Sequence, residues 1–124
     1  MSEEKRVSRG PLSETEKPWG GEELLAHTER YALKRIHVKQ GSRPSLQYHV
    51  RKSESLYLLS GRLRIEVGDS KDSLVASEMR SGEIVDVPAG KLHRVSALEN
   101  SVIIEGSTPE LDDVVRVEDD YDRA

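Results

Sequence analysis

The clearest hydrophobic pattern in the chain is the strict alternation in RLRIEV, residues 62–67. Leu63, Ile65 and Val67 alternate with charged residues, which is the two-residue period of a half-buried β-strand. Similar short segments recur between turn signals; they are GGEELLAH, YALKRIHVK, SLQYHV, ESLYLLS, SLVASEM, EIVDVP, HRVSAL and SVIIEG. No long stretch carries a convincing helical stripe. The pattern predicts an all-β domain of many short antiparallel strands, a sandwich or a barrel-like jelly roll.

Both ends of the chain differ from this middle part. Residues 1–16 contain only Val7 and Leu12 as large apolar residues and are rich in charge, Ser, Gly and Pro. Such a segment buries too little surface to offset its ordering entropy, so we expect a mobile N-terminal arm followed by one domain over residues 17–124. The last segment, STPELDDVVRVEDDYDRA, holds seven acidic residues from Glu110 onward and two arginines.

Composition narrows the class of protein. The formal net charge of -4 argues against a nucleic-acid binder, because neutralising phosphates requires a basic face. The sequence contains no cysteine, so any metal must be held by nitrogen and oxygen ligands. No apolar run approaches the length of a membrane span, and the N-terminus lacks the apolar core of a signal peptide. We therefore expect a soluble, cytoplasmic protein without a membrane partner.

Candidate metal chemistry lies in QYHVRKSE, residues 47–54. Gln47 and His49 are two residues apart in a predicted strand and so point to the same face, and an antiparallel neighbour starting at Glu54 could return its carboxylate to that face. His93, in GEIVDVPAGKLHRV, is the fourth candidate ligand, from a separate strand. Imidazoles suit Zn, Fe, Mn, Co or Ni, and a carboxylate adds the charge that holds a divalent ion. The alternative is that these residues are surface polar groups and satisfied core histidines.

Glycine and proline residues typical of turns flank the segments that contain the candidate ligands. Gly41, Gly61, Gly82 and Gly90 stand at predicted strand ends, where a positive φ is expected, and Pro88 stiffens a strand exit. Ser60-Gly61 and Glu99-Asn100 are predicted to form tight hairpins.

The ligand candidates and turn residues together resemble both halves of the bipartite cupin signature. They read G-x5-Q-x-H-x4-E-x6-G from Gly41 to Gly61 and G-x5-P-x-G-x2-H from Gly82 to His93, with Gln47 where the first histidine usually stands. Ala97 stands where the second motif often ends in Asn. The resemblance implies a small single-domain cupin jelly roll with one divalent metal ion.

A narrower resemblance covers roughly residues 16–123. KPWG, KRIHVKQGSRPSLQYH, VPAGKLHRV and DDVVRVEDDYDR are similar to the cupin domain of type II phosphomannose isomerases, which usually follows a mannose-1-phosphate guanylyltransferase domain. This resemblance implies zinc at Gln47, His49, Glu54 and His93, with Mn, Fe, Co or Ni as alternatives. It also implies interconversion of mannose 6-phosphate and fructose 6-phosphate through a cis-enediol.

Departures from the family pattern leave other functions open. Members tend to read QMHHHRAEHW where this chain reads QYHVRKSESL, so Arg51, Lys52 and Ser55-Leu56 replace residues beside the ligands. Besides an isomerase, we consider a non-enzymatic module that binds a sugar or sugar phosphate, and another metal-dependent cupin enzyme such as an oxygenase or epimerase.

Other site residues and the partners are predicted as follows. The candidates for a catalytic base are Lys34, His37, Asp119 and Glu54, the last only if it is not locked on the metal. An acidic chain must capture a phosphorylated sugar through a few local cations, and the candidates are Lys17, Lys52 and Arg116, with Arg94 disfavoured because strand parity turns it away from His93. We expect a small-molecule sugar phosphate as ligand and a homodimer formed through a sheet edge.

Overall fold

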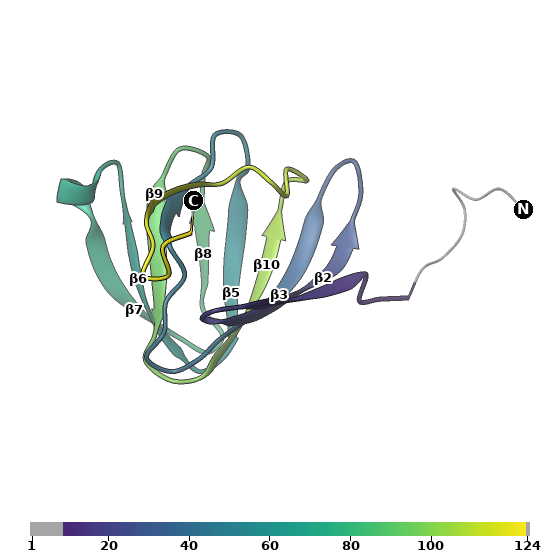
Figure 1. The fold of residues 1–124 in the computed structure, drawn as a ribbon, viewed down its shortest axis with the longest axis horizontal. Helices are drawn as coiled ribbons and strands as arrows, with labels where there is room; N and C mark the ends of the chain where they lie inside the picture. Colours follow the sequence, from purple (N-terminus) through teal and green to yellow (C-terminus); the bar gives the residue numbers. More distant parts are fainter. Residues whose placement is uncertain (1–8, 124) are drawn as a thin grey trace, which may run out of the picture.

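The computed structural model describes residues 9–123, which form eleven β-strands and one short 3-10 helix, η2 (Lys71–Ser73). All strand pairs are antiparallel and belong to two sheets that surround a common interior (Figure 1). In spatial order, the six-stranded sheet contains β1 (Ser13–Lys17), β2 (Gly20–His27), β3 (Ala32–Val38), β10 (Ser101–Ser107), β5 (Glu54–Ser60) and β8 (Ile84–Val87). The five-stranded sheet contains β11 (Val115–Glu118), β4 (Leu46–Tyr48), β9 (Leu92–Ala97), β6 (Arg62–Gly68) and β7 (Val75–Arg80). The predicted all-β jelly roll is confirmed.

Two strands were not predicted. β1 falls within the expected mobile arm and pairs along its whole length with β2, from Ser13 opposite Leu24 to Lys17 opposite Gly20. The prediction of a mobile arm is therefore wrong for residues 13–16, while residues 1–8 lie outside the described range. β11 falls in the acidic tail and pairs with β4. Both strands lie at sheet edges and bury little, so their hydrophobic pattern is weak.

The two predicted hairpins are wrong. Ser60-Gly61 joins β5 to β6, and Glu99-Asn100 joins β9 to β10, but in each case the two strands belong to different sheets. These turns carry the chain from one layer to the other. Turn residues such as Ser-Gly predict that the chain reverses direction, but they do not predict whether the two flanking strands pair with each other or join different sheets.

A hydrophobic core fills the interior between the sheets. Leu58 of β5 and Leu63 of β6 are fully buried, and Ile103 of β10 is 2% exposed. The alternation predicted for residues 62–67 is confirmed, because Leu63 and Ile65 are buried while Arg62 and Arg64 are exposed. Burial of each such side chain contributes about 1.5–3 kcal/mol. Among residues 9–123, no helix is long and apolar enough to cross a membrane.

The turn at Gly61 shows why glycine is required where the chain changes sheet. Gly61 has a φ of 96°, and a β-carbon at this position would collide with the carbonyl oxygen of Asn100 and the hydroxyl of Ser101. That hydroxyl accepts a hydrogen bond from the Arg62 amide at 3.1 Å, so the turn is fixed from both sides. Gly41 also has a positive φ, 81°, but nothing lies within 4 Å of an added β-carbon.

This difference gives a matched pair of variants. Gly41→Ala should cost about 1 kcal/mol from the left-handed backbone alone. Gly61→Ala should cost about 3 kcal/mol, because steric overlap adds to the same backbone strain. Urea denaturation of both variants measures the two free energies of unfolding, and equal losses would contradict the close packing at Gly61.

Candidate functional site

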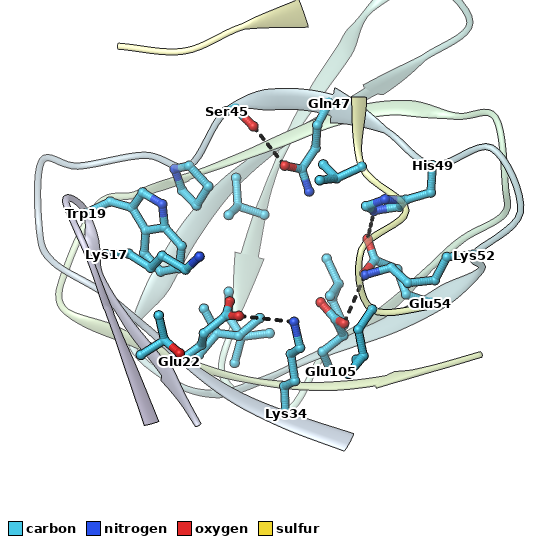
Figure 2. Close-up of a pocket in the computed structure, with 18 of the residues that line it drawn as sticks. Lys17, Trp19, Glu22, Lys34, Ser45, Gln47, His49, Lys52, Glu54 and Glu105 are labelled. Atoms are coloured by element: carbon cyan, nitrogen blue, oxygen red, sulfur yellow. Dashed lines mark hydrogen bonds and ion pairs between the residues drawn. The ribbon is translucent and has the colours of Figure 1, made fainter. Parts of the chain in front are cut away.

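A cavity of about 420 Å³ lies between the two sheets and gathers most of the polar side chains of the interior. Figure 2 shows two groups on opposite sides of it. Lys17, Trp19 and Glu22 lie on one side, His49, Lys52, Glu54 and Glu105 lie on the other, and Lys34 lies between the two groups (Figure 2).

The second side contains a cluster able to hold a metal ion. The candidate ligand atoms of His49, Glu54 and His93 all lie within 4.8 Å of one another, and all three residues are buried. Glu54 Oε1 lies 3.2 Å from His49 Nε2 and 2.9 Å from His93 Nε2. Two imidazoles and one carboxylate therefore converge on a single point.

Backbone carbonyls orient both imidazoles toward that point. His49 Nδ1 lies 2.6 Å from the Asp113 carbonyl oxygen, and His93 Nδ1 lies 2.9 Å from the Lys91 carbonyl oxygen. A carbonyl only accepts, so each Nδ1 donates a proton to it. Each Nε2 can then donate to Glu54 only from a protonated ring, whereas in a neutral ring its lone pair is available to a cation beside the carboxylate. The donor set fits a divalent ion with nitrogen and oxygen ligands.

Three strands bring these side chains together. Gln47 is on β4, directly opposite His93 of β9, and His49 follows β4 by one residue. Glu54 begins β5, which was expected to be a neighbour of β4 but belongs to the opposite sheet. The Glu54 carboxylate therefore reaches the histidines across the interior.

Gln47, the fourth predicted ligand, also lines the cavity. Its side-chain oxygen accepts a hydrogen bond from the Ser45 hydroxyl at 2.8 Å (Figure 2). With this bond the amide oxygen faces Ser45 and the amide nitrogen faces the cavity (Figure 2).

Lys52 and Glu105 extend the buried cluster. Lys52 Nζ lies 3.5 Å from Glu54 and 3.3 Å from Glu105, and all three side chains are nearly inaccessible. Burial opposes a charge on Lys52, but Glu105 and Glu54 outweigh it and raise the pKa of its ammonium group. Burial would raise the pKa of Glu54, but hydrogen bonds with His49 and His93 and the charge of Lys52 hold it far below the usual range.

The pKa of Glu105, in contrast to that of Glu54, is raised. Burial and the neighbouring Glu54 charge raise the pKa of Glu105 to about 7. Sequence reasoning missed this residue, although a signal was present. Glu105 shares strand parity with Ser101 and Ile103, both buried, so it is an acid on the inner face of β10.

Among the predicted substrate-binding residues, Lys17 and Arg116 line the cavity. Arg116 lies opposite Gln47 in the β11–β4 pair. Lys52 also lines it, but its ammonium is committed to two buried carboxylates, so the prediction that Lys52 is available for a phosphate group conflicts with its placement.

Of the predicted candidates for the catalytic base, Lys34 lines the cavity, whereas His37 and Asp119 do not. Lys34 lines the cavity and pairs with Glu22 at 3.1 Å. His37 is not among the cavity-lining residues; it pairs with Glu23 at 3.2 Å on an exposed part of the surface. Asp119 accepts hydrogen bonds from the Arg123 side chain, which with backbone amides lowers its pKa to about 2 and makes it a poor base. Neither His37 nor Asp119 is placed for proton transfer in the cavity.

Arg94 joins the C-terminal segment to the barrel. It is 5% exposed and donates hydrogen bonds to the carbonyl oxygens of Pro44, at 3.2 Å, and Glu118, at 3.1 Å. Burial and the nearby Arg43 charge lower the pKa of the Arg94 guanidinium. These contacts give Arg94 a structural role.

Asp113 holds the loop between His49 and Glu54 in place. Its carbonyl oxygen accepts from His49 Nδ1, and its carboxylate accepts hydrogen bonds from the amides of Val50, Arg51 and Lys52 at 3.0, 2.6 and 2.8 Å. The hydrogen bonds from Arg51 and Val50 lower the pKa of this carboxyl group to about 2, so it stays charged at neutral pH. One residue therefore fixes both the ring of His49 and the loop leading to Glu54.

Removing this carboxylate should loosen the metal cluster. We expect Asp113→Ala to weaken Zn²⁺ binding by about 10- to 100-fold, as for other residues that orient metal ligands. Competition with a chromophoric chelator measures the affinity, and Asp72→Ala, an exposed acid on η2, is the control. An unchanged affinity in Asp113→Ala would show that the loop holds its position without this residue.

Comparisons with known proteins agree with the fold and with the family resemblance. Residues 5–119 match the family described as "Mannose-6-phosphate isomerase C-terminal". Relatives include the xanthan biosynthesis protein XanB of Xanthomonas campestris pv. campestris (strain B100), 35% identical over 86% of this chain and 23% of its own length. The mannose-1-phosphate guanylyltransferase ManC of Salmonella typhimurium is 32% identical over 89% of this chain and 23% of its own length. The chain thus spans about a quarter of the length of these relatives.

Solved structures support the fold alone, because their sequences are distant. KdgF from Halomonas sp. superposes with a TM-score of 0.69 at 21% identity, covering 77% of this chain and 85% of its own. Oxalate decarboxylase from Bacillus subtilis gives a TM-score of 0.73 at 18% identity, covering 85% of this chain and 30% of its own. With the family match spanning most of its length, the chain belongs to the mannose-6-phosphate isomerase C-terminal family and has the cupin fold.

Proposed function

We propose that this chain is a metal-dependent cupin that binds a phosphorylated sugar and interconverts its aldose and ketose forms, with mannose 6-phosphate as the first substrate to test. The observation that carries this proposal is the coexistence, in one cavity, of a candidate metal cluster and several cationic side chains. Six Lys and Arg residues and four Asp and Glu residues line the cavity, and Arg94 and Arg123 also pair with Glu118 and Asp119 beside it. In a chain with a net charge of -4, these local cations are the groups that can hold an anionic ligand.

The metal would be held by His49, Glu54 and His93, with Gln47 as the fourth ligand. Zinc suits two imidazoles with oxygen donors, and Mn, Fe, Co and Ni accept the same set. A divalent ion at this position supplies positive charge to an oxygen on which negative charge develops. To bind the ion, the Gln47 amide would have to turn the oxygen that now accepts from Ser45 toward the cluster.

Phosphate binding is assigned to Lys17 and Arg116. Lys17 approaches the cavity from the side opposite His49 (Figure 2), so a sugar between them could present its phosphate to Lys17 and its carbonyl end to the ligand cluster. Lys34 also lines the cavity, although Glu22 already balances its charge.

Proton transfer between C1 and C2 of the sugar requires a base near the ligand cluster. We assign this role to Glu105 on geometry, because its carboxylate lines the cavity and shares the Lys52 ammonium with Glu54. A carboxylate so placed can accept the proton at one carbon and return it at the next. Lys34 is a weaker choice, because an ion-paired ammonium has no lone pair to accept a proton.

A second candidate function is a sugar-phosphate-binding module without catalysis. It is favoured by Lys52, whose ammonium lies 3.5 Å from Glu54 Oε2 and competes with a metal for that carboxylate. The replacement of the family's HW pair by Ser55-Leu56 beside the ligand also favours it.

Metal binding should depend on both histidines. His49→Ala and His93→Ala should each lose stoichiometric metal in elemental analysis, because each removes one of two imidazole ligands. Gln47→Ala should lose less, because a neutral amide oxygen is the weakest donor. His27→Ala, an exposed histidine whose ring lies 3.0 Å from the Pro109 carbonyl oxygen, is the control. Full metal content in both cluster variants would disprove the ligand assignment.

Isomerase activity is tested by coupling fructose 6-phosphate formation from mannose 6-phosphate to a dye-forming reaction. We expect activity that EDTA removes and Zn²⁺ restores. Glu105→Gln should lower kcat about 100-fold or more with metal content retained, because it removes the proton acceptor.

The other outcomes separate the alternatives. Binding of mannose 6-phosphate without conversion would favour the binding module. Oxygen consumption would indicate a different metal-cupin reaction, and a full rate in Glu105→Gln would remove Glu105 from the mechanism.

A further inference from the structure

The last described residues of the chain form an ordered turn beside the cavity. Asp119 accepts hydrogen bonds from the backbone amides of Tyr121, at 3.2 Å, and Arg123, at 2.9 Å. Tyr121 is partly buried and packs against the hydrophobic core. The segment after β11 is therefore held against the barrel by specific contacts.

This turn fixes the side chain of Arg123. Its Nε donates to Asp119 at 2.7 Å and its Nη2 donates to the same carboxylate at 3.2 Å. The Asp119 side chain is only 4% exposed, and the guanidinium carbon lies 5.8 Å from the centre of the Tyr121 ring. Arg123 therefore has one well-defined orientation.

Arg123 also lines the same cavity as the metal cluster. A guanidinium carries five N–H donors in a planar fork, and the two bonds to Asp119 use only part of them. The remaining donors, on Nη1 and on the second hydrogen of Nη2, lie on the edges of the fork that Asp119 does not occupy. An arginine oriented in this way binds an oxyanion at little further cost in side-chain entropy.

The simpler interpretation is an ion pair between residues four apart, which is worth about 1 kcal/mol at most on a surface. That interpretation accounts for the bonds between Asp119 and Arg123. It does not account for the buried position of the Asp119 carboxylate or for the location of Arg123 at the cavity, beside a lining that is rich in cations.

We propose that Arg123, oriented by Asp119, binds the phosphate group of the ligand in the cavity. This inference rests on the proposed function for the identity of the sugar, but not for the phosphate itself. It gives Asp119 a positioning role in place of the catalytic role considered from the sequence. It also makes the end of the chain part of the ligand site.

The test compares wild type with Arg123→Gln, Asp119→Asn and the control Arg80→Gln, an exposed arginine of β7. Calorimetry measures binding of three probes to metal-loaded protein: mannose 6-phosphate, mannose and inorganic phosphate. Arg123→Gln should weaken mannose 6-phosphate and inorganic phosphate by about 10- to 100-fold, because it removes charge-assisted hydrogen bonds. Mannose binding, metal content and the behaviour of Arg80→Gln should match wild type.

Asp119→Asn should produce a smaller loss for the same two probes, because the amide still orients the turn but no longer holds the guanidinium by charge. Arg123→Lys should restore part of the phosphate affinity, which a purely structural residue would not show. Equal weakening of mannose and mannose 6-phosphate, or no weakening of either phosphate probe, would overturn the proposal.

The same measurements distinguish failure of the proposed sugar-phosphate function from failure of the proposed role of Arg123. If wild type binds inorganic phosphate through Arg123 but neither binds nor converts mannose 6-phosphate, the sugar assignment is wrong and the phosphate site remains. If wild type binds no phosphate probe, the role of Arg123 is wrong.

Discussion

The rest of the site depends on the contacts that the buried Glu54 carboxylate makes with two histidines and a lysine. A charge in the interior of a small β-sandwich is costly unless it is fully partnered. Here the partners are His49, His93 and Lys52, and Glu105 in turn partners Lys52. These groups come from both sheets, so their ion pairs and hydrogen bonds connect the two layers, in addition to the packing of the apolar core.

Edge segments of the chain complete this cluster. β1 and the turn after it bring Lys17 and Trp19 to one side of the cavity, and the segment around Asp113 orients His49 from the other. Arg94 fastens β11 by donating to the Glu118 carbonyl oxygen. The parts of the chain with the weakest hydrophobic pattern are thus the parts that shape the site.

Much of the fold could be predicted because burial in a sandwich enforces a two-residue period. β2 and β5 were predicted to the residue, and β6 to within one, because their inner faces are apolar or carry a motif residue. β1 and β11 could not be predicted, because edge strands bury too little to leave a pattern. Turn residues predicted the reversals at Gly61 and Asn100 but not which sheet each strand would join.

The site was predictable to the extent that it depends on side-chain type and spacing. His49, Glu54 and His93 converge as predicted, although Glu54 reaches the histidines from the opposite sheet and not from a neighbouring strand. The commitment of Lys52 to buried acids and the outward placement of His37 depend on contacts between segments that are distant in sequence. Arg123 ends DDVVRVEDDYDR, one of the segments that carry the family resemblance, but its position at the cavity follows from the turn that Asp119 holds.

We propose that Gln47, His49, Glu54 and His93 form one metal centre, and X-ray absorption at the metal K-edge of the protein as purified tests this most directly. We expect one metal equivalent with two imidazoles and oxygen donors, at about 2.0–2.1 Å if the metal is zinc. A shell without imidazole scattering, or a metal present only in trace amounts and not restored by added Zn²⁺, would contradict it.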